Sequence, residues 1–119
     1  MFTRRQMIAR LRDAAREWPA VVLSGARRTG KTTAFQHAFP KAQYVLLEDP
    51  DVELRARSDP RGFLDGLQPP VLFDEIQNVP ELFRYVRTKI DRNQRLAGQW
   101  FFTGSLELSI REAQPGGLS

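Results

Sequence analysis

The chain has 119 residues, 41% of them hydrophobic and 27% charged, which is the length and composition of a single globular domain. It has no cysteine and one histidine, His37, so disulfide scaffolds, cysteine-bound metals and histidine-rich metal centres are excluded. The missing cysteines favour a cytoplasmic protein, and no apolar run reaches the roughly 18 residues of a membrane span. The 18 Lys and Arg against 14 Asp and Glu leave a net charge of +4, which suits a phosphate-bearing partner.

The first predicted element is an amphipathic helix from Thr3 to Trp18. Apolar residues recur every three or four positions along it, and arginines occupy the remaining faces. Thr3 and Gln6 have the spacing of a capping box, and Pro19 stops the helix. Because the helix is rich in arginine, a nucleic acid is one possible partner, and DNA binding stays open as an alternative function.

Four short apolar runs then predict strands that are buried on both faces of a sheet, at residues 20–24, 44–47, 71–74 and 99–102. Helices are predicted between them at 31–39, within 48–57, from residue 59, and from Pro80 to about Asp91. This alternation predicts an α/β fold of three layers with a mostly parallel sheet in the middle. Residues 1–110 are expected to form this core, and residues 111–119 a disordered tail, because periodicity is lost there.

The strongest motif is a phosphate-binding loop, because residues 25–32 read GARRTGKT and match G-x-x-x-x-G-K-[ST] between a buried strand and a helix. Backbone N–H groups of such a loop converge on phosphates, and the following helix adds the positive end of its dipole. Lys31 can then reach the β- and γ-phosphates, and the Thr32 hydroxyl can bind Mg²⁺. The residues predicted to bind the nucleotide are Gly25, Ala26, Arg27, Arg28, Thr29, Gly30, Lys31, Thr32 and Thr33.

A second motif, VLFDE at residues 71–75, is an apolar strand that ends in two acidic residues. In a parallel sheet its carboxyl end opens at the same edge as the phosphate loop. Asp74 is therefore predicted to hold Mg²⁺, and Glu75 to act as general base toward a water molecule. A weaker signal is FFTGS at residues 101–105, where a hydroxyl or amide at the strand end could hydrogen-bond the γ-phosphate.

Together these segments resemble a known family. The chain looks like the bacterial and archaeal AAA-type ATPases that carry a DUF4143 C-terminal region, through the blocks VLSGARRTGKTT, YVLLEDPD, DPRGFL, VLFDEIQNVPELFRYVRTKID and FFTGS. The resemblance implies a P-loop NTPase fold of the ASCE type, with sheet order 5-1-4-3-2, that binds and hydrolyses ATP with Mg²⁺. It also implies that Glu75 activates water, that Lys31 binds phosphate and that Ser105 occupies the sensor-1 position. These three are the predicted catalytic residues, and Thr32 and Asp74 are the predicted metal ligands.

The chain departs from this family after Ser105. Family members continue with another strand, a lid with a sensor-2 arginine and a large C-terminal domain, which residues 106–119 do not reproduce. We therefore expect a truncated ATPase core with four strands, in which the C-terminal strand and the lid are missing and turnover is slow or partner-dependent. Besides ATP, the expected partners are further copies of the chain or a C-terminal half. A nucleotide-binding module with little catalysis and a P-loop kinase are the alternatives.

Overall fold

A computed structural model of the chain describes residues 3–24, 30–92, 96–104 and 116–118. Its strands form one sheet and are β1 (Ala20–Ser24), β2 (Gln43–Leu46), β3 (Val71–Asp74), β4 (Trp100–Gly104) and β5 (Gly116–Leu118). Their order is β2-β3-β4-β1-β5, and all neighbouring strands run parallel. The predicted α/β fold with a parallel sheet is confirmed, and the strand order is the one that the family resemblance implies.

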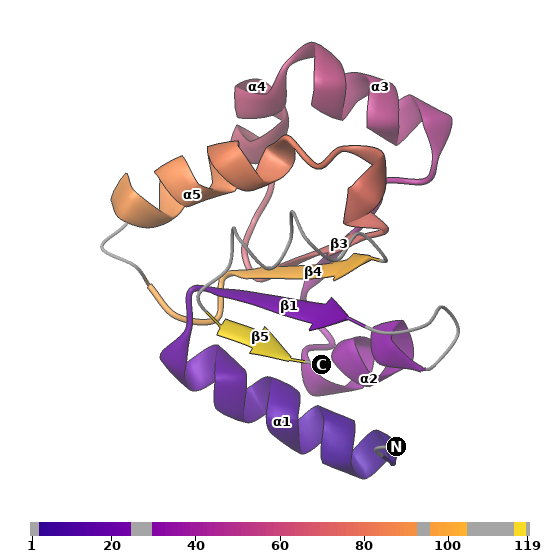
Figure 1. The fold of residues 1–119 in the computed structure, drawn as a ribbon, viewed down its shortest axis with the longest axis vertical. Helices are drawn as coiled ribbons and strands as arrows, with labels where there is room; N and C mark the ends of the chain where they lie inside the picture. Colours follow the sequence, from indigo (N-terminus) through magenta and orange to yellow (C-terminus); the bar gives the residue numbers. More distant parts are fainter. Residues whose placement is uncertain (1–2, 25–29, 93–95, 105–115, 119) are drawn as a thin grey trace.

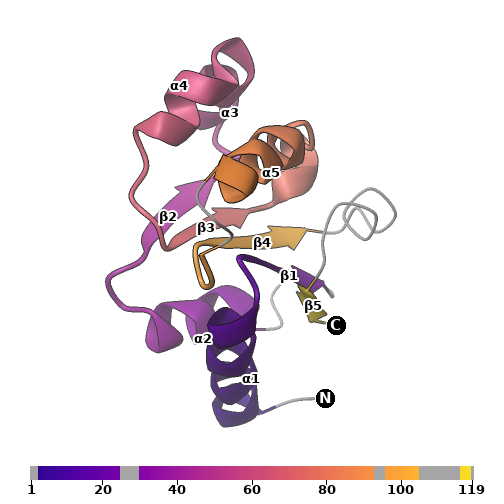
Figure 2. The same cartoon turned by 90° about the vertical axis from the view of Figure 1, so that its left-hand side faces the viewer.

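Helices cover both faces of the sheet (Figures 1 and 2), as parallel sheets require. One face carries α1 (Arg4–Glu17) and α2 (Lys31–Ala38), and the other carries α3 (Pro50–Ser58), α4 (Pro60–Asp65) and α5 (Leu82–Arg92). A 3₁₀ turn, η1 (Ile76–Asn78), follows β3 directly. None of the helices in the described ranges is long and apolar enough to cross a membrane.

The first helix is one residue shorter at each end than the predicted Thr3–Trp18, because these two residues are its N-cap and C-cap. Thr3 accepts a hydrogen bond from the Gln6 N–H, and the Gln6 side chain accepts one from the Thr3 N–H, so the capping box forms. Trp18 is the C-cap residue in an extended conformation, and its side chain is 37% exposed. The helix is held to the sheet mainly by Leu11, which is fully buried.

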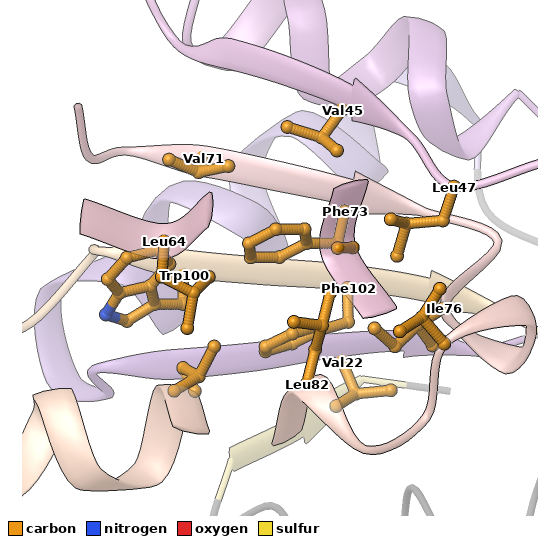
Figure 3. Packing of buried hydrophobic residues seen from close by; sticks show 14 residues of the cluster. Val22, Val45, Leu47, Leu64, Val71, Phe73, Ile76, Leu82, Trp100 and Phe102 are labelled. Atoms are coloured by element: carbon orange, nitrogen blue, oxygen red, sulfur yellow. The ribbon is translucent and has the colours of Figure 1, made fainter. Parts of the chain in front are cut away.

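Side chains of successive strand residues point to opposite faces, and this alternation divides the core in two. The larger cluster lies between the sheet and α3–α5 and includes Val22, Val71, Phe73, Trp100 and Phe102 (Figure 3). The smaller cluster lies between the sheet and α1–α2 and includes Leu11, Val21, Phe35, Leu72 and Phe101. Since Asp74 and Thr103 come two residues after Leu72 and Phe101, their side chains share the face that carries α2.

A tight turn at Gly98, just before β4, packs against the end of α1. The Gly98 N–H donates to the Trp18 carbonyl at 2.8 Å, and the Trp100 N–H donates to the Pro19 carbonyl at 3.0 Å. Gly98 has φ +71°, and a Cβ at this position would lie 2.9 Å from the Ala15 carbonyl oxygen. Both the backbone conformation and the close approach therefore require glycine here.

The C-terminal strand differs from the sequence expectation. We expected four strands with residues 111–119 as a tail, whereas Gly116–Leu118 form β5 and pair with Val21–Leu23 of β1. The edge of β1 offers unpaired N–H and C=O groups, so backbone pairing alone can place a strand there. Residues 116–118 include two glycines and have no alternation of apolar and polar residues from which a strand could be predicted. Residues 111–115 lie outside the described residues.

Candidate functional site

The candidate site lies at the carboxyl edge of the sheet, where β3 and β4 end beside the start of α2. Asp74 closes β3, Thr103 lies near the end of β4, and Lys31 and Thr32 begin α2. Both Asp74 and Thr103 are buried, with 8% and 3% of their surface exposed. A carboxylate buried to this degree requires hydrogen-bond partners, and its partners define the site.

Three hydroxyl groups from three different elements donate to the Asp74 carboxylate. Thr32 Oγ1 donates to Oδ2 at 3.2 Å, and the Tyr44 hydroxyl of β2 donates to the same oxygen at 2.6 Å. The Thr103 hydroxyl donates to the other oxygen, Oδ1. Hydrogen bonds from three donors satisfy both oxygens of the buried carboxylate and fix its orientation at the end of the strand.

Tyr44 remains a hydrogen-bond donor because its proton is held tightly. Partial burial raises the pKa of the Tyr44 hydroxyl above its ordinary value of 10, and the hydrogen bond to Asp74 raises it further. The negative charges of Asp74, Glu75 and Glu48 act in the same direction, because a phenolate beside them would be repelled. At neutral pH the phenol is therefore protonated and directed at Asp74.

Glu75 has an uncommon backbone conformation for a residue other than glycine, with φ 62° and ψ 54°. Its N–H donates to Thr103 Oγ1 at 3.2 Å, and its carbonyl accepts from the Asn78 side chain at 3.0 Å. The Gln77 amide donates to Glu75 Oε1 at 2.6 Å. These contacts hold a left-handed residue at the end of β3, and such strained positions persist only where surrounding contacts fix them.

Lys31 is the cationic side chain of the site, and its environment both weakens and supports its charge. Partial burial lowers the pKa of the Lys31 amine, because an ammonium group loses hydration there. The carboxylates of Glu75 and Asp74 oppose this shift and favour the charged form. An anionic ligand bound beside Lys31 would favour the charged form in the same way.

The start of α2 has the form of an anion-binding helix terminus. Gly30 precedes the helix with φ 88°, a left-handed conformation that glycine adopts without strain. Gly30 as the N-cap residue has no side chain that could cap this terminus with a hydrogen bond. The N–H groups of a first helical turn have no acceptor within the helix, and together with the dipole they attract phosphate.

Comparison with known proteins places this arrangement in a family. A family model described as an AAA domain matches residues 17–116, most of the chain. The chain belongs to the AAA domain family. Domains of this family generally bind ATP with Mg²⁺, so the general kind of this domain is nucleotide-binding and ATPase-like.

Two curated relatives of this AAA domain are the uncharacterized protein Rv2008c of Mycobacterium tuberculosis and the uncharacterized protein Mb2031c of Mycobacterium bovis. Each is 34% identical over 93 residues. The match covers 77% of this chain and 21% of each relative, so the chain spans about a fifth of the relatives' length. No solved structure matches the chain significantly.

The described part of the AAA domain brings together only some of the residues predicted from sequence. Thr32 and Asp74 are in hydrogen-bond contact, and Lys31 and Glu75 are close enough to interact electrostatically. Thr33 is exposed on the first turn of α2, and Gly30 precedes that turn. The remaining predicted positions, which are Gly25, Ala26, Arg27, Arg28, Thr29 and Ser105, lie outside the described residues.

Sequence reasoning missed two residues of the site and gave a third a different role. Tyr44 and Gln77 were not singled out, although they contact Asp74 and Glu75. The hydroxyl of Thr103 was considered as a contact to a phosphate, yet it bonds to Asp74 and to the Glu75 N–H. The signal for Tyr44 is the strand register, in which Leu46 pairs with Asp74 and Tyr44 therefore lies on the same face.

The oxygen atoms of this AAA domain fit a Mg²⁺ ion. Mg²⁺ prefers oxygen ligands and binds proteins through one or two side chains plus phosphate oxygens and water. The Asp74 carboxylate and the Thr32 hydroxyl supply such oxygens 3.2 Å apart, at the start of an uncapped helix. The donor set and its place beside a phosphate-binding terminus both match the metal.

Proposed function

We propose that this domain binds ATP together with Mg²⁺ and hydrolyses the bond between the β- and γ-phosphates. The observation that supports this most is the hydrogen bond between Thr32 and Asp74. It joins the residue after the motif lysine to the acidic end of β3, although the two motifs are far apart in sequence. Two independent sequence signals for the same chemistry therefore meet at one point of the fold.

In the proposed complex, the first turn of α2 and the amine of Lys31 bind the phosphates, and residues 25–29 contribute their backbone N–H groups. Thr32 and Asp74 would hold Mg²⁺, which when bound neutralises part of the phosphate charge. Thr103 and Tyr44 keep the Asp74 carboxylate in place through their hydrogen bonds. We also propose that Ser105 contacts the terminal phosphate, as its position in the family resemblance implies.

Glu75 is the proposed general base. The oxygen of a water molecule attacks the γ-phosphorus, the bond to the β–γ bridging oxygen breaks, and ADP leaves with the bonding electrons. The water proton passes to the Glu75 carboxylate, which Gln77 orients by its hydrogen bond to Oε1. The fixed left-handed backbone of Glu75 keeps this carboxylate beside Asp74 and Lys31.

Turnover by the isolated chain is expected to be slow. An arginine supplied by a neighbouring subunit increases the rate of comparable P-loop enzymes by about 10³–10⁵. We also propose that the chain is related to the ATPases with a DUF4143 region. This relation implies that it assembles with further copies of itself or with a C-terminal half. A second copy of the chain is therefore the first partner to test for stimulation.

The experiment is a titration of the purified chain with a fluorescent ATP analogue, with and without Mg²⁺, followed by a phosphate-release assay. Lys31→Ala should abolish binding, whereas Lys41→Ala, which removes an exposed lysine after α2, should leave it unchanged. Binding without phosphate release would indicate a nucleotide-binding module with little catalysis. If the wild-type chain is folded by circular dichroism but does not bind the ATP analogue, the proposal is overturned.

Glu75→Gln tests the catalytic step by itself. Glutamine keeps an oxygen for the Gln77 hydrogen bond but cannot accept the proton, so phosphate release should fall by about 10²–10⁴-fold while ATP binding is retained. Glu17→Gln, at the exposed end of α1, is the matched control and should keep the wild-type rate. An unchanged rate in Glu75→Gln would remove Glu75 from the mechanism.

A further inference from the structure

A basic depression lies on the outer side of α1 and α2, apart from the site at the sheet edge. It has a volume of about 570 Å³ and is lined by Arg4, Arg5, Ile8, Ala9 and Arg12 of α1 and by His37 of α2. The two helices lie side by side under the sheet (Figure 2). The exposed arginines of α1 border an open surface, to which Ile8 and Ala9 contribute apolar side chains.

Within the described part of the chain, no carboxylate neutralises the arginines of this depression. Among the described residues, no carboxylate lies within ion-pair distance of Arg4, Arg5 or Arg12. Arg16, one turn beyond Arg12 and outside the depression, is paired with Asp13 at 2.5 Å. Three guanidinium groups without an ion-pair partner among the described residues therefore line one depression. Arg16 of the same helix, in contrast, forms an ion pair with Asp13.

We propose that this depression binds the phosphate backbone of a nucleic acid. From Arg4 to Arg12 the helix rises by roughly 12 Å, so the three charges form a short row rather than a single point. Guanidinium groups bind phosphate through two hydrogen bonds, and a row of them suits a polymer with regularly spaced phosphates. The sequence pI of about 10.1, together with basic residues gathered along one helix, is the electrostatic pattern of such proteins.

The shape of the depression favours a nucleic acid over an acidic protein segment. Protein interfaces draw most of their affinity from apolar or aromatic anchors that fill desolvated pockets. Here the surface is open, and its apolar side chains are Ile8 and Ala9, with no aromatic anchor among the lining residues, so the arginine charges are the main source of affinity. Contacts of this kind are made to phosphates and not to base edges, and binding should therefore be independent of sequence.

The test is fluorescence anisotropy of a labelled DNA duplex with the full chain, without nucleotide, between 50 and 200 mM salt. Three phosphate contacts predict a slope of log K against log salt of about −3. Arg12→Gln should reduce the size of this slope by about one. Arg16→Gln is the matched control, because it removes the same charge from the same helix outside the depression, and it should leave the slope unchanged.

Four results would overturn the proposal. One is a wild-type chain that shows no binding at the lowest salt concentration. A second is a salt response that is flat. A third is an equal loss of affinity in Arg12→Gln and Arg16→Gln, which would indicate an effect of net charge only. The fourth is polyglutamate competing as well as unlabelled DNA, which would assign the depression to acidic polymers in general. Circular dichroism of both variants checks that α1 is intact, and neither residue belongs to the proposed ATP site.

Discussion

The Tyr44 hydroxyl and the Asp74 carboxylate are joined by a 2.6 Å hydrogen bond on Oδ2, the oxygen that also accepts from Thr32. Tyr44 is 41% exposed and lies on β2, whereas Asp74 is buried at the end of β3. The phenol therefore reaches from the outer strand of the sheet to the residue proposed to hold Mg²⁺. Its hydrogen bond gives the phenol a role in orienting that carboxylate.

Tyr44→Phe should weaken the response to Mg²⁺ without weakening nucleotide binding itself. Loss of a partner that orients a metal-binding side chain typically costs ten- to a hundredfold in metal affinity. We expect the Mg²⁺ concentration for half-maximal effect on ATP-analogue binding to rise by about tenfold, while binding without Mg²⁺ is unchanged. Tyr85→Phe, the same change at the second tyrosine of the chain, is the control because Tyr85 packs against the opposite face.

The same tyrosine should make stability fall at alkaline pH. The pKa of Tyr44 is raised in the folded protein, so the unfolded chain loses this proton at a lower pH than the folded chain does. The contribution of Tyr44 is therefore fully present below about pH 10 and is lost as the pH rises further. Urea unfolding between pH 9 and 11.5 should show a steeper fall for the wild type than for Tyr44→Phe. Parallel curves would contradict this linkage.

Thr103→Val should destabilise the chain, because Thr103 is buried and serves two partners at once. It donates to Asp74 and accepts from the Glu75 N–H, so valine leaves both groups without that partner. The expected cost is about 1–3 kcal/mol in the free energy of unfolding, measured by urea denaturation. Thr103→Ser keeps the hydroxyl and should recover most of this loss. Equal destabilisation by both variants would show that the methyl group matters more than the hydrogen bonds.

Gly98→Ala should also destabilise the fold, for a reason far from the site. The added Cβ would come within 2.9 Å of the Ala15 carbonyl oxygen, and φ +71° is strained for alanine. We expect a loss of about 1–3 kcal/mol in urea denaturation. Gly66→Ala is the control, since Gly66 has φ −81° and its nearest atoms would lie 3.7 Å from the Cβ. A stable Gly98→Ala chain would mean that α1 can shift away from the turn.

The sequence predicted four of the five strands in the described part of the chain, two of them with the bounds that the structure has, because their signals are local. Residues 20–24 and 71–74 are apolar runs bounded by prolines and acidic or glycine-containing segments, and both strands have those bounds in the structure. That Thr32 and Asp74 lie close together could also be predicted from the sequence, since parallel topology brings the carboxyl ends of strands to one edge of the sheet. These expectations needed only composition, periodicity and a known motif.

The features that the sequence does not predict depend on contacts between residues far apart in the chain. No local signal marks Glu75 for a left-handed backbone, which is fixed by Thr103 and Asn78. The helix expected from Pro80 begins at Leu82, because the chain before it forms turns with i→i+3 hydrogen bonds. The Leu82 N–H donates to the Val79 carbonyl, and the Phe83 N–H donates to the Pro80 carbonyl. The partnership of Tyr44 with Asp74 required the register of β2 against β3, which periodicity does not determine.

The position of β1 in the sheet has a consequence for how the protein is made. This strand, which leads into the phosphate loop, is synthesised well before its parallel partners Trp100–Gly104 and Gly116–Leu118, which follow it at a large separation along the chain. Contacts between such distant segments close large loops and form slowly. During translation the growing polypeptide therefore carries an apolar strand without neighbours until β4 has emerged. The nucleotide site can therefore be completed only after β4 has been synthesised, and until then β1 is an unpaired apolar strand of the kind that chaperones protect.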